Sequence, residues 1–302
     1  MDDRAYAVTA LTPRAIERIR TLPEFRRARE YRLYTGDGRR YLDLWQEDGH
    51  AAGGHRSGGW REVLSNKLSR GLSLPLPGPE AQKLRQAVRT WISLEVETAG
   101  GHVSMDRRPV YLFRDERARA NALFSLAPDL RIRDALCSLP GGSARAVLVR
   151  AFSAPRFASQ EWLLPVLPLP QMFAVSCLIG PEGASRDSRL VEDLVAPAIL
   201  AAGARAVYDV CRMLRSGTHP GSILAADLQR SGVWAACGPW LLPSVGDEQQ
   251  AYDRLFAEHA ANNIVLNPVA GAPSLVPAVV TKGERDRILG AAERARSCGL
   301  GR

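Results

Sequence analysis

Apolar and polar positions alternate in the first part of the chain and then change to a helical spacing. Two alternating runs, at residues 31–35 and 39–44, flank an Asp-Gly turn, which is the pattern of a β-hairpin. Apolar side chains recur at helical spacing over residues 60–72 and 80–94, and the proline-rich segment 74–79 separates the two runs. The pattern therefore predicts a hairpin followed by two helices.

From residue 109 onward, short apolar runs alternate with helical stretches. The pattern predicts strands at 110–113, 146–152 and 172–179, and helices at 115–126 and 189–215. Pro197 lies inside the last of these helices and is expected to bend it or to begin its main part. Strands that alternate with helices favour a mainly parallel sheet flanked by helices.

We predict an α/β fold with two domains, of which the smaller is built from both ends of the chain. Residues 1–77 and 233–302 are assigned to this smaller α+β domain, and residues 78–232 to the large α/β domain with the mainly parallel sheet. A chain of 302 residues that is 46% hydrophobic is long enough to bury a sizeable core.

Nothing in the pattern predicts a membrane segment or a secretory signal. The chain contains no run of 18 uncharged apolar residues, and its first residues lack a basic stretch followed by an apolar one. The expected location is the cytoplasm, with no membrane partner.

The charge is positive but diffuse. The formal net charge is +8, and arginine supplies almost all of the excess, because Lys67, Lys83 and Lys282 are the only lysines. The arginines are scattered and often stand beside acids, as at residues 113–117. A phosphate-binding protein usually gathers its cations on one face, so a nucleic-acid partner is not predicted.

Cysteine and histidine spacing does not predict a metal site. The five cysteines lie far apart with no C-x-x-C pair, so we expect reduced thiols. His50 and His55 share the loop after the hairpin, where a structural role is expected. No Walker loop, G-x-S-x-G, G-x-G-x-x-G or H-E-x-x-H motif is present.

Four stretches resemble segments of the class III aminotransferases, a branch of fold type I pyridoxal-phosphate enzymes, and they occur in the same order. Residues 35–44, T-G-D-G-R-R-Y-L-D-L, resemble the N-terminal hairpin of that family. Residues 110–123 resemble its strand-turn-helix, and the alanine-rich residues 196–210 resemble the long helix that links its domains. Residues 238–277 are similar to its C-terminal small domain. The alternative is an unrelated α/β protein of similar composition.

The resemblance implies a cofactor that the chain is poorly equipped to hold. In the family, pyridoxal phosphate forms a Schiff base with a lysine of the large domain, upstream of the linking helix. Residues 161–183 correspond to that region and contain no lysine. The middle of the chain also looks shortened relative to the family. We therefore expect no cofactor and no transamination.

The phosphate cradle implied by the resemblance is degenerate. Aligning Ala120 and the following asparagine with the family's A-N places Asp115, Glu116, Arg117 and Ala118 where the family carries N-S-G-S. Glu116 would set a carboxylate beside a dianion, a repulsion of about 4 kcal/mol per charge pair at about 4 Å and an effective dielectric of about 20. An ordinary charged first turn of a helix is the preferred interpretation.

Two other groups that the family uses are also missing from their expected places. The family pairs the pyridine nitrogen with an aspartate in the middle of the sheet. Here the nearest acid after the run at 172–179 is Glu182, which is typical of a loop residue. Ser274 stands near the position of the arginine that clamps the substrate carboxylate in many aminotransferases. We therefore predict no catalytic residues.

These expectations combine into a hypothesis of function. The chain is predicted to be a non-catalytic, aminotransferase-like pseudoenzyme that acts as a scaffold or partner-binding homodimer, because members of the family dimerise. Two alternatives stay open. An active pyridoxal-phosphate aminotransferase would need an unusual lysine, such as Lys282 or Lys67. A binding module for another anionic ligand would use Arg114, Arg117 or Arg119.

Overall fold

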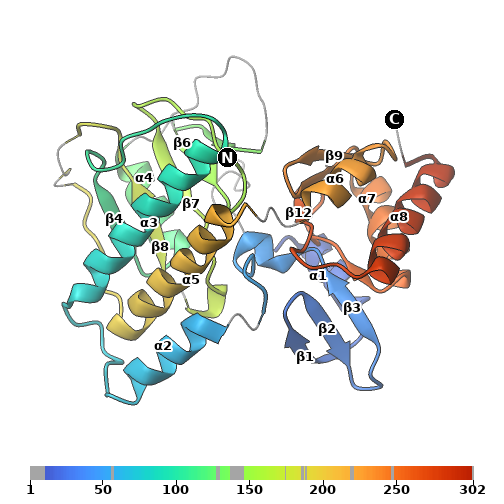
Figure 1. Cartoon of the computed structure of the whole chain (residues 1–302), viewed down its shortest axis with the longest axis horizontal. Helices are drawn as coiled ribbons and strands as arrows, with labels where there is room; N and C mark the ends of the chain where they lie inside the picture. Colours follow the sequence, from blue (N-terminus) through green and yellow to red (C-terminus); the bar gives the residue numbers. More distant parts are fainter. Residues whose placement is uncertain are drawn as a thin grey trace. The chain divides into compact units, whose positions relative to one another are not determined.

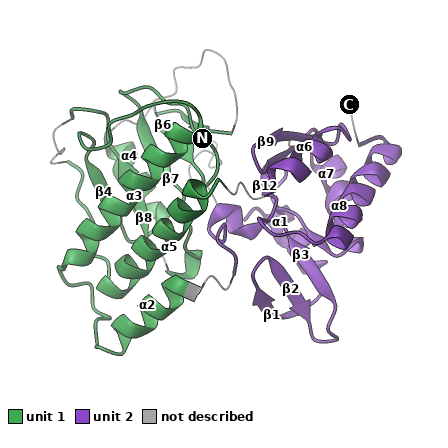
Figure 2. Cartoon of the chain, in the orientation of Figure 1, with its two compact units in different colours: residues 1–8, 57–217 green, residues 9–56, 218–302 purple. Residues whose placement is uncertain are grey.

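The computed structural model divides the chain into two compact units, which are coloured separately in Figure 2. Unit 1 comprises residues 1–8 and 57–217, and unit 2 comprises residues 9–56 and 218–302. The structure describes residues 11–55, 58–126, 130–136, 146–173, 175–184, 187, 189–217, 221–245 and 248–300. The turn predicted at residues 140–143 and Cys137 lie outside the described residues.

Unit 1 contains a five-stranded sheet. Its strands, in spatial order, are β4 (Val110–Phe113), β8 (Ser176–Ile179), β7 (Trp162–Pro165), β6 (Ala146–Val149) and β5 (Ile132–Asp134). Strands β5, β6 and β7 pair in parallel, whereas β8 is antiparallel to both β7 and β4. Four strands therefore run in one direction, and β8 makes the predicted mainly parallel sheet a mixed one.

Helices cover both faces of this sheet. They are α2 (Gly58–Leu68), α3 (Pro79–Thr98), α4 (Glu116–Leu126) and α5 (Pro197–Arg215). Leu123 of α4 packs on Tyr111 and Phe113, which point to the same face of β4. Helices α3 and α5 lie together on the opposite face of the sheet, as Figure 1 shows, and α2 packs on α5. The described part of the chain thus confirms an α/β unit flanked by helices.

The start of α5 differs from the predicted helix at 189–215. The helix begins at Pro197, and the described residues between Arg189 and Ala196 are not helical. Proline is favoured in the first turn because an N–H group there would have no acceptor within the helix, so its absence costs no hydrogen bond. Similarly, the predicted strand at 172–179 is divided into a short 3₁₀ turn, η3 (Gln171–Phe173), and the strand β8.

Unit 2 contains two small sheets. One joins the predicted hairpin to the C-terminal part of the chain, in the order β1 (Phe25–Arg29), β2 (Arg32–Thr35), β3 (Arg40–Asp43) and β11 (Ile264–Val265). The other has the order β12 (Ser274–Leu275), β10 (Trp240–Pro243) and β9 (Trp234–Cys237). Because β3 pairs in parallel with β11, residues from both ends of the chain share one sheet.

Four α-helices complete unit 2 within the described residues: α1 (Pro13–Arg20), α6 (Ser222–Gln229), α7 (Gln249–Ala261) and α8 (Lys282–Ala295). A 3₁₀ turn, η2 (Gln46–Gly49), follows β3, and a π-helical turn, η4 (Arg296–Leu300), follows α8. The core of the unit includes Trp234, Tyr252 and Ile288. The prediction of an α+β unit built from both termini agrees with this arrangement.

The unit boundaries fall at other positions than residues 77 and 232, where the sequence pattern places them. Helix α2 precedes residue 77 but packs on α5, so it groups with unit 1. Helix α6 precedes residue 232 but packs on β9 and α8, so it groups with unit 2. No helix among the described residues is both long enough and apolar enough to span a membrane.

Candidate functional site: the first turn of α4 and its surroundings

The residues aligned with the phosphate cradle form the turn between β4 and α4. Asp115 is the last residue before α4, and its Oδ1 accepts a hydrogen bond of 2.7 Å from the backbone N–H of Ala118. Glu116 and Arg117 occupy the first turn of the helix. An aspartate at this position caps a helix and neutralises its positive end. One of the N–H groups that would face a phosphate is therefore bonded to a carboxylate.

The three arginines near this turn differ in their surroundings. Arg114 and Arg117 are exposed, and the nearest ion-pair contact of Arg114 is with Asp115 at 3.7 Å. Arg119 is 1% exposed, and its Nη2 lies 3.6 Å from Oε1 of Glu116. Its Nε and Nη1 have no hydrogen-bond partner among the described residues. Burial lowers the pKa of Arg119 from its ordinary value.

The three lysines lie on helices rather than in the sheet of unit 1. Lys67 is near the end of α2, where its Nζ donates a 2.5 Å hydrogen bond to Oε1 of Glu80. Lys83 is exposed on α3, and Lys282 is the exposed first residue of α8 in unit 2. The segment 166–175 between β7 and β8, described except for residue 174, supplies no amine either, because its sequence contains no lysine.

The acids near the sheet either already pair with an arginine or lie at the end of the sheet away from the first turn of α4. Asp134, the last residue of β5, accepts a 3.0 Å hydrogen bond from Nε of the buried Arg150, which follows β6. Glu182 follows β8, and β8 runs against the other four strands. Glu182 is therefore placed at the end of the sheet where β4 and β7 begin, whereas α4 starts at the end of the sheet where β4 ends.

A buried carboxylate that the sequence reasoning missed lies on α3. Glu95 is 0% exposed, and it accepts hydrogen bonds from Nε1 of Trp91 at 2.9 Å and from the backbone N–H groups of Phe152 at 2.5 Å and Ala154 at 3.1 Å. Burial raises its pKa to about 7, although these hydrogen bonds act in the opposite direction. The available signal was an acid directly after the predicted helix at 80–94, one helical turn after a tryptophan.

The segment that binds Glu95 has an unusual backbone. Phe152 and Ala154 both have left-handed conformations, with φ of 62° and 45°. Such conformations are costly for residues other than glycine and persist where the surrounding contacts impose them. The carboxylate of Glu95 supplies such contacts, because it binds the N–H groups of both residues. It therefore positions the chain between β6 and β7.

In unit 2, the loop after the hairpin is held by its own polar residues. Asp43 accepts hydrogen bonds from the backbone N–H groups of Trp45 and Gln46, and its Oδ2 lies 2.7 Å from Nε2 of His55. Burial lowers the pKa of His55, but the hydrogen bond with Asp43 and nearby carboxylates give a net rise above its ordinary value. His50 is buried. The described residues contain no group of three or more side chains suited to a metal.

Ser274, which stands near the family's substrate-arginine position, is fully buried in unit 2. Its Oγ accepts a hydrogen bond of 3.0 Å from the backbone N–H of Asn267. Among the cysteines, Cys177 and Cys211 are buried, and burial raises their pKa to about 12 and about 11. These groups therefore contribute to packing and turn geometry.

Comparisons with known proteins identify the fold. No protein-family model matches the chain. An uncharacterized protein of Treponema pallidum (strain Nichols) is 26% identical over 283 residues, which cover 86% of this chain and 91% of that protein.

Several aminotransferases are among the solved structures that the chain resembles. An omega-transaminase from Sphaerobacter thermophilus aligns with a TM-score of 0.59 and 12% identity over 91% of both chains. Acetylornithine aminotransferase from Elizabethkingia anophelis gives 0.57 and 12% over 91% of this chain and 93% of that one. Ornithine delta-aminotransferase from Plasmodium falciparum gives 0.62 and 8% over 92% and 94%. The chain therefore has the fold of the class III pyridoxal-phosphate-dependent aminotransferases.

Proposed function

We propose that this chain is a non-catalytic protein with an aminotransferase fold that does not hold pyridoxal phosphate and acts by binding a second copy of itself or a partner protein. The observation that carries the proposal is the placement of its three lysines. Pyridoxal-phosphate catalysis needs a lysine amine beside the cofactor aldehyde. Lys67 is paired with Glu80, Lys83 is exposed on α3, and Lys282 begins α8, so the sheet of unit 1 offers no such amine.

The first turn of α4 also fits the cofactor poorly. The carboxylate of Asp115 already caps Ala118, and Glu116 adds a second negative charge to the same turn. A phosphate dianion there would lose a backbone donor and meet two carboxylates. Asp134 is paired with Arg150 and is unsuited to a second cationic partner at the pyridine nitrogen. These contacts support the absence of both binding and transamination.

The test of this part is the visible absorption of the full chain after incubation with pyridoxal phosphate and dialysis. We expect no retained Schiff-base band and, after borohydride reduction, no single pyridoxyl-lysine in the peptide map. An active aminotransferase treated in parallel should retain both signals. A retained band abolished by K282R or K67R would instead establish the alternative, an enzyme with an unusual lysine.

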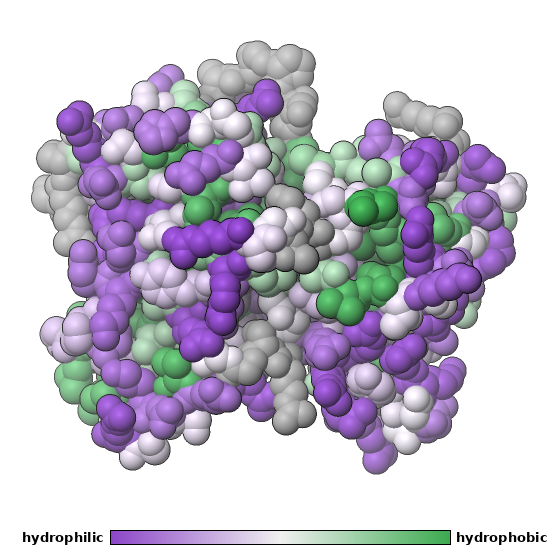
Figure 3. All heavy atoms as spheres, in the orientation of Figure 1, coloured by the Kyte–Doolittle hydropathy of each residue, from purple (hydrophilic) through white to green (hydrophobic). Residues whose placement is uncertain are grey.

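The binding role rests on the resemblance to a dimeric family and on exposed apolar side chains of unit 2. Ile223 of α6 and Val279, which precedes α8, are 78% and 58% exposed. Figure 3 shows hydrophobic surface over α6 and over the segment before α8, among hydrophilic residues. Exposed apolar side chains that gather on one surface are typical of interaction sites.

Light scattering on the full chain tests self-association. We expect a dimer, and we expect the double variant I223D/V279D to lower its stability, because each substitution would bury an unpaired carboxylate. The matched control is V191D in unit 1, where Val191 is also 78% exposed. If the chain were a monomer at every concentration, the proposal of a homodimer would be wrong, and only binding to a partner protein would remain.

A further inference from the structure

Unit 1 contains a cavity of about 480 Å³ at one end of the strands of its sheet, away from the end at which α4 begins. Its wall combines the end of α3 and the segment that follows it with Arg108, the segment 155–159 and Glu182. Arg108 precedes β4, residue 159 precedes β7, and Glu182 follows the antiparallel β8. The cavity is therefore at the end of the sheet where β4 and β7 begin, and the length of β4 separates it from the turn at Asp115. Its volume is within the range of small-molecule sites.

Arg108 places a fully buried positive charge in the wall of this cavity. It is 0% exposed, and its Nη1 and Nη2 donate to four backbone carbonyls, those of Ala158, Ser159, Glu161 and Gly180, at 2.8–3.1 Å. These carbonyls are dipoles and carry no net negative charge. The Nε of Arg108 has no hydrogen-bond partner among the described residues.

No described carboxylate forms an ion pair with Arg108. The nearest candidate by sequence, Glu161, directs its carboxylate to Arg133, at 3.2 Å, and to the backbone N–H of Ala158. Burial lowers the pKa of Arg108, while the more distant charges of Glu182 and Glu161 act to raise it. A buried cation without a counter-ion is unfavourable, and an anion in the cavity would reduce that cost.

The other polar residues of the wall add a second cation. Arg156 is exposed, and its guanidinium makes no hydrogen bond or ion pair with any described residue. His102 lines the same cavity, and Glu182 is the one acidic residue among the lining residues. Two arginines against one carboxylate leave the wall with a net positive charge near neutral pH.

The cavity also has an apolar side. Phe157 and Val103 line it, and the ring of Phe157 packs on the guanidinium of Arg108, whose Cζ is 5.1 Å from the ring centroid. An aromatic face beside a cation is suited to a ligand that combines an apolar body with a negative group.

We propose that this cavity binds a small anionic molecule with one carboxylate or phosphate group. Arg156 holds the anionic group directly, Arg108 stabilises it through its uncompensated charge, and Phe157 and Val103 contact the apolar body. Glu182 opposes binding by repulsion. This site is separate from the family's cofactor position, because the turn aligned with the family's phosphate cradle is at the start of α4, at the other end of the sheet.

Calorimetric titration of the full chain at low salt, with phenyl phosphate and benzoate as probes, tests the site. We expect saturable binding of at least one probe, a loss of about tenfold or more in affinity for R156E, and a gain of a few-fold for E182Q. R117E is the matched control, because Arg117 is also exposed but lies on α4. It should bind as the unchanged chain does, and thermal melting should show that all variants are folded.

Three outcomes would overturn the proposal: no binding at millimolar probe, equal binding by R156E, or loss of binding in R117E instead. Inorganic phosphate should bind more weakly than phenyl phosphate, and equal affinities would contradict the contact with Phe157. The result is independent of the cofactor test, since a chain that retained pyridoxal phosphate through a lysine would still titrate with these probes.

Discussion

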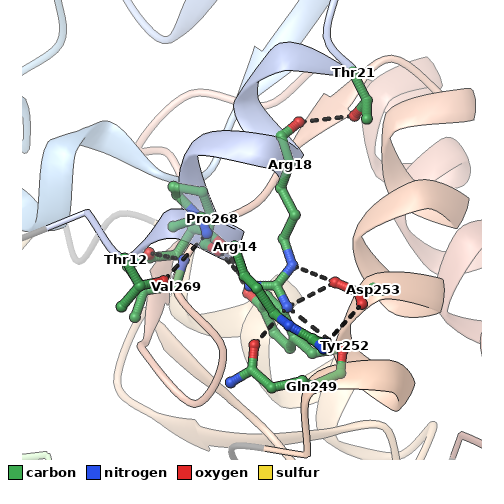
Figure 4. Close-up of polar contacts among 11 residues, drawn as sticks. Thr12, Arg14, Arg18, Thr21, Gln249, Tyr252, Asp253, Pro268 and Val269 are labelled. Carbon is green, nitrogen blue, oxygen red and sulfur yellow. Dashed lines mark hydrogen bonds and ion pairs between the residues drawn. The ribbon is translucent and has the colours of Figure 1, made fainter.

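At the scale of single residues, Arg18 illustrates how unit 2 joins distant parts of the sequence. Arg18 lies on α1 and is 5% exposed. Figure 4 shows its guanidinium between Asp253 and Gln249 of α7 and the carbonyl of Pro268, with the ring of Tyr252 beneath it. These contacts attach α1 to α7 and to the turn after β11.

Replacing Arg18 by alanine should therefore destabilise unit 2. Hydrogen bonds to charged groups are worth more than neutral ones, so we expect R18A to lower the free energy of unfolding by about 3 kcal/mol. Arg14 offers a matched control on the same helix, because it is 53% exposed and lies 3.6 Å from the same aspartate. R14A should cost less than about 1 kcal/mol. Urea titrations measure both, and equal effects would show that burial of Arg18 is unimportant.

Glu95 gives a prediction about pH, because its pKa rises from 4.5 to about 7 on folding. The folded state therefore binds the proton more tightly than the unfolded chain does. The resulting stabilisation is fully present below the unfolded pKa and is lost as the pH rises through the folded pKa. Between about pH 4.5 and pH 8, the loss is on the order of 3 kcal/mol.

Glutamine at position 95 cannot ionise, so E95Q should lack this pH dependence. We expect the free energy of unfolding of the unchanged chain to fall relative to E95Q as the pH rises from about 5 to 8. E97Q is the control, because Glu97 is exposed on the same helix and should behave like the unchanged chain. Urea titrations of all three chains at about pH 5 and pH 8 measure these free energies of unfolding. A constant difference between E95Q and the unchanged chain would mean that Glu95 keeps one protonation state.

At the scale of elements, two glycines should respond oppositely to alanine. A methyl group on Gly203, inside α5, would meet Leu84 at 3.6 Å and Val175 at 3.7 Å, which are ordinary contacts. G203A should therefore stabilise unit 1 by about 1 kcal/mol through helix propensity. Gly221, before α6, has φ of 67° and would place the methyl group on the side chain of Val276. G221A should destabilise unit 2 by more than about 2 kcal/mol.

Thermal melting of the two glycine variants provides the measurement, with the unchanged chain as reference. A destabilised G203A would indicate that α3 and α5 are too close for a methyl group. A neutral G221A would indicate that Val276 moves away at little cost. Either result would be informative about packing, because the first glycine lies between helices and the second at a helix start.

The sequence predicted the elements that have strong local patterns. The hairpin of β2 and β3 follows from its Asp-Gly turn, and α3 follows from its apolar spacing after Pro79. The strands β5 and β7 were missed because β5 is three residues long and carries two charged side chains, and β7 ends in a proline. The direction of β8 was equally hidden, since a short, largely apolar run does not encode which way a strand runs.

The candidate site was predicted unevenly for a related reason. The composition of the turn at Asp115 and the absence of lysine from residues 161–183 are visible in the sequence. The contacts of Glu95 are not, because the N–H groups that it binds are 57 and 59 positions away. The environment of Arg108 depends on carbonyls 50 to 72 positions further along the chain. Long-range backbone contacts of this kind leave no local pattern.

At the scale of the whole molecule, many of the arginines that give the chain its net charge of +8 are paired with nearby acids. Among the described residues, several acids each bind two arginines, and three of these acids are largely buried. Asp209 binds Arg205 and Arg212, Asp227 binds Arg230 and Arg285, and Glu284 binds Arg32 and Arg40. All three acids are less than one-fifth exposed, so these pairs are partly shielded from salt. Many arginines are thereby withdrawn from contact with an external phosphate chain.

We therefore expect weak binding to nucleic acid in spite of the sequence pI of about 9.6. Affinity for duplex DNA depends on the number of cations that replace condensed counterions, and a diffuse set of paired arginines replaces few. Fluorescence anisotropy with a short labelled duplex should show no saturation below about 10 μM protein at about 150 mM salt. The variant R205A/R212A should leave this result unchanged. Submicromolar binding with a steep salt dependence would contradict the expectation, because it would show that enough unpaired arginines gather on one face to displace condensed counterions.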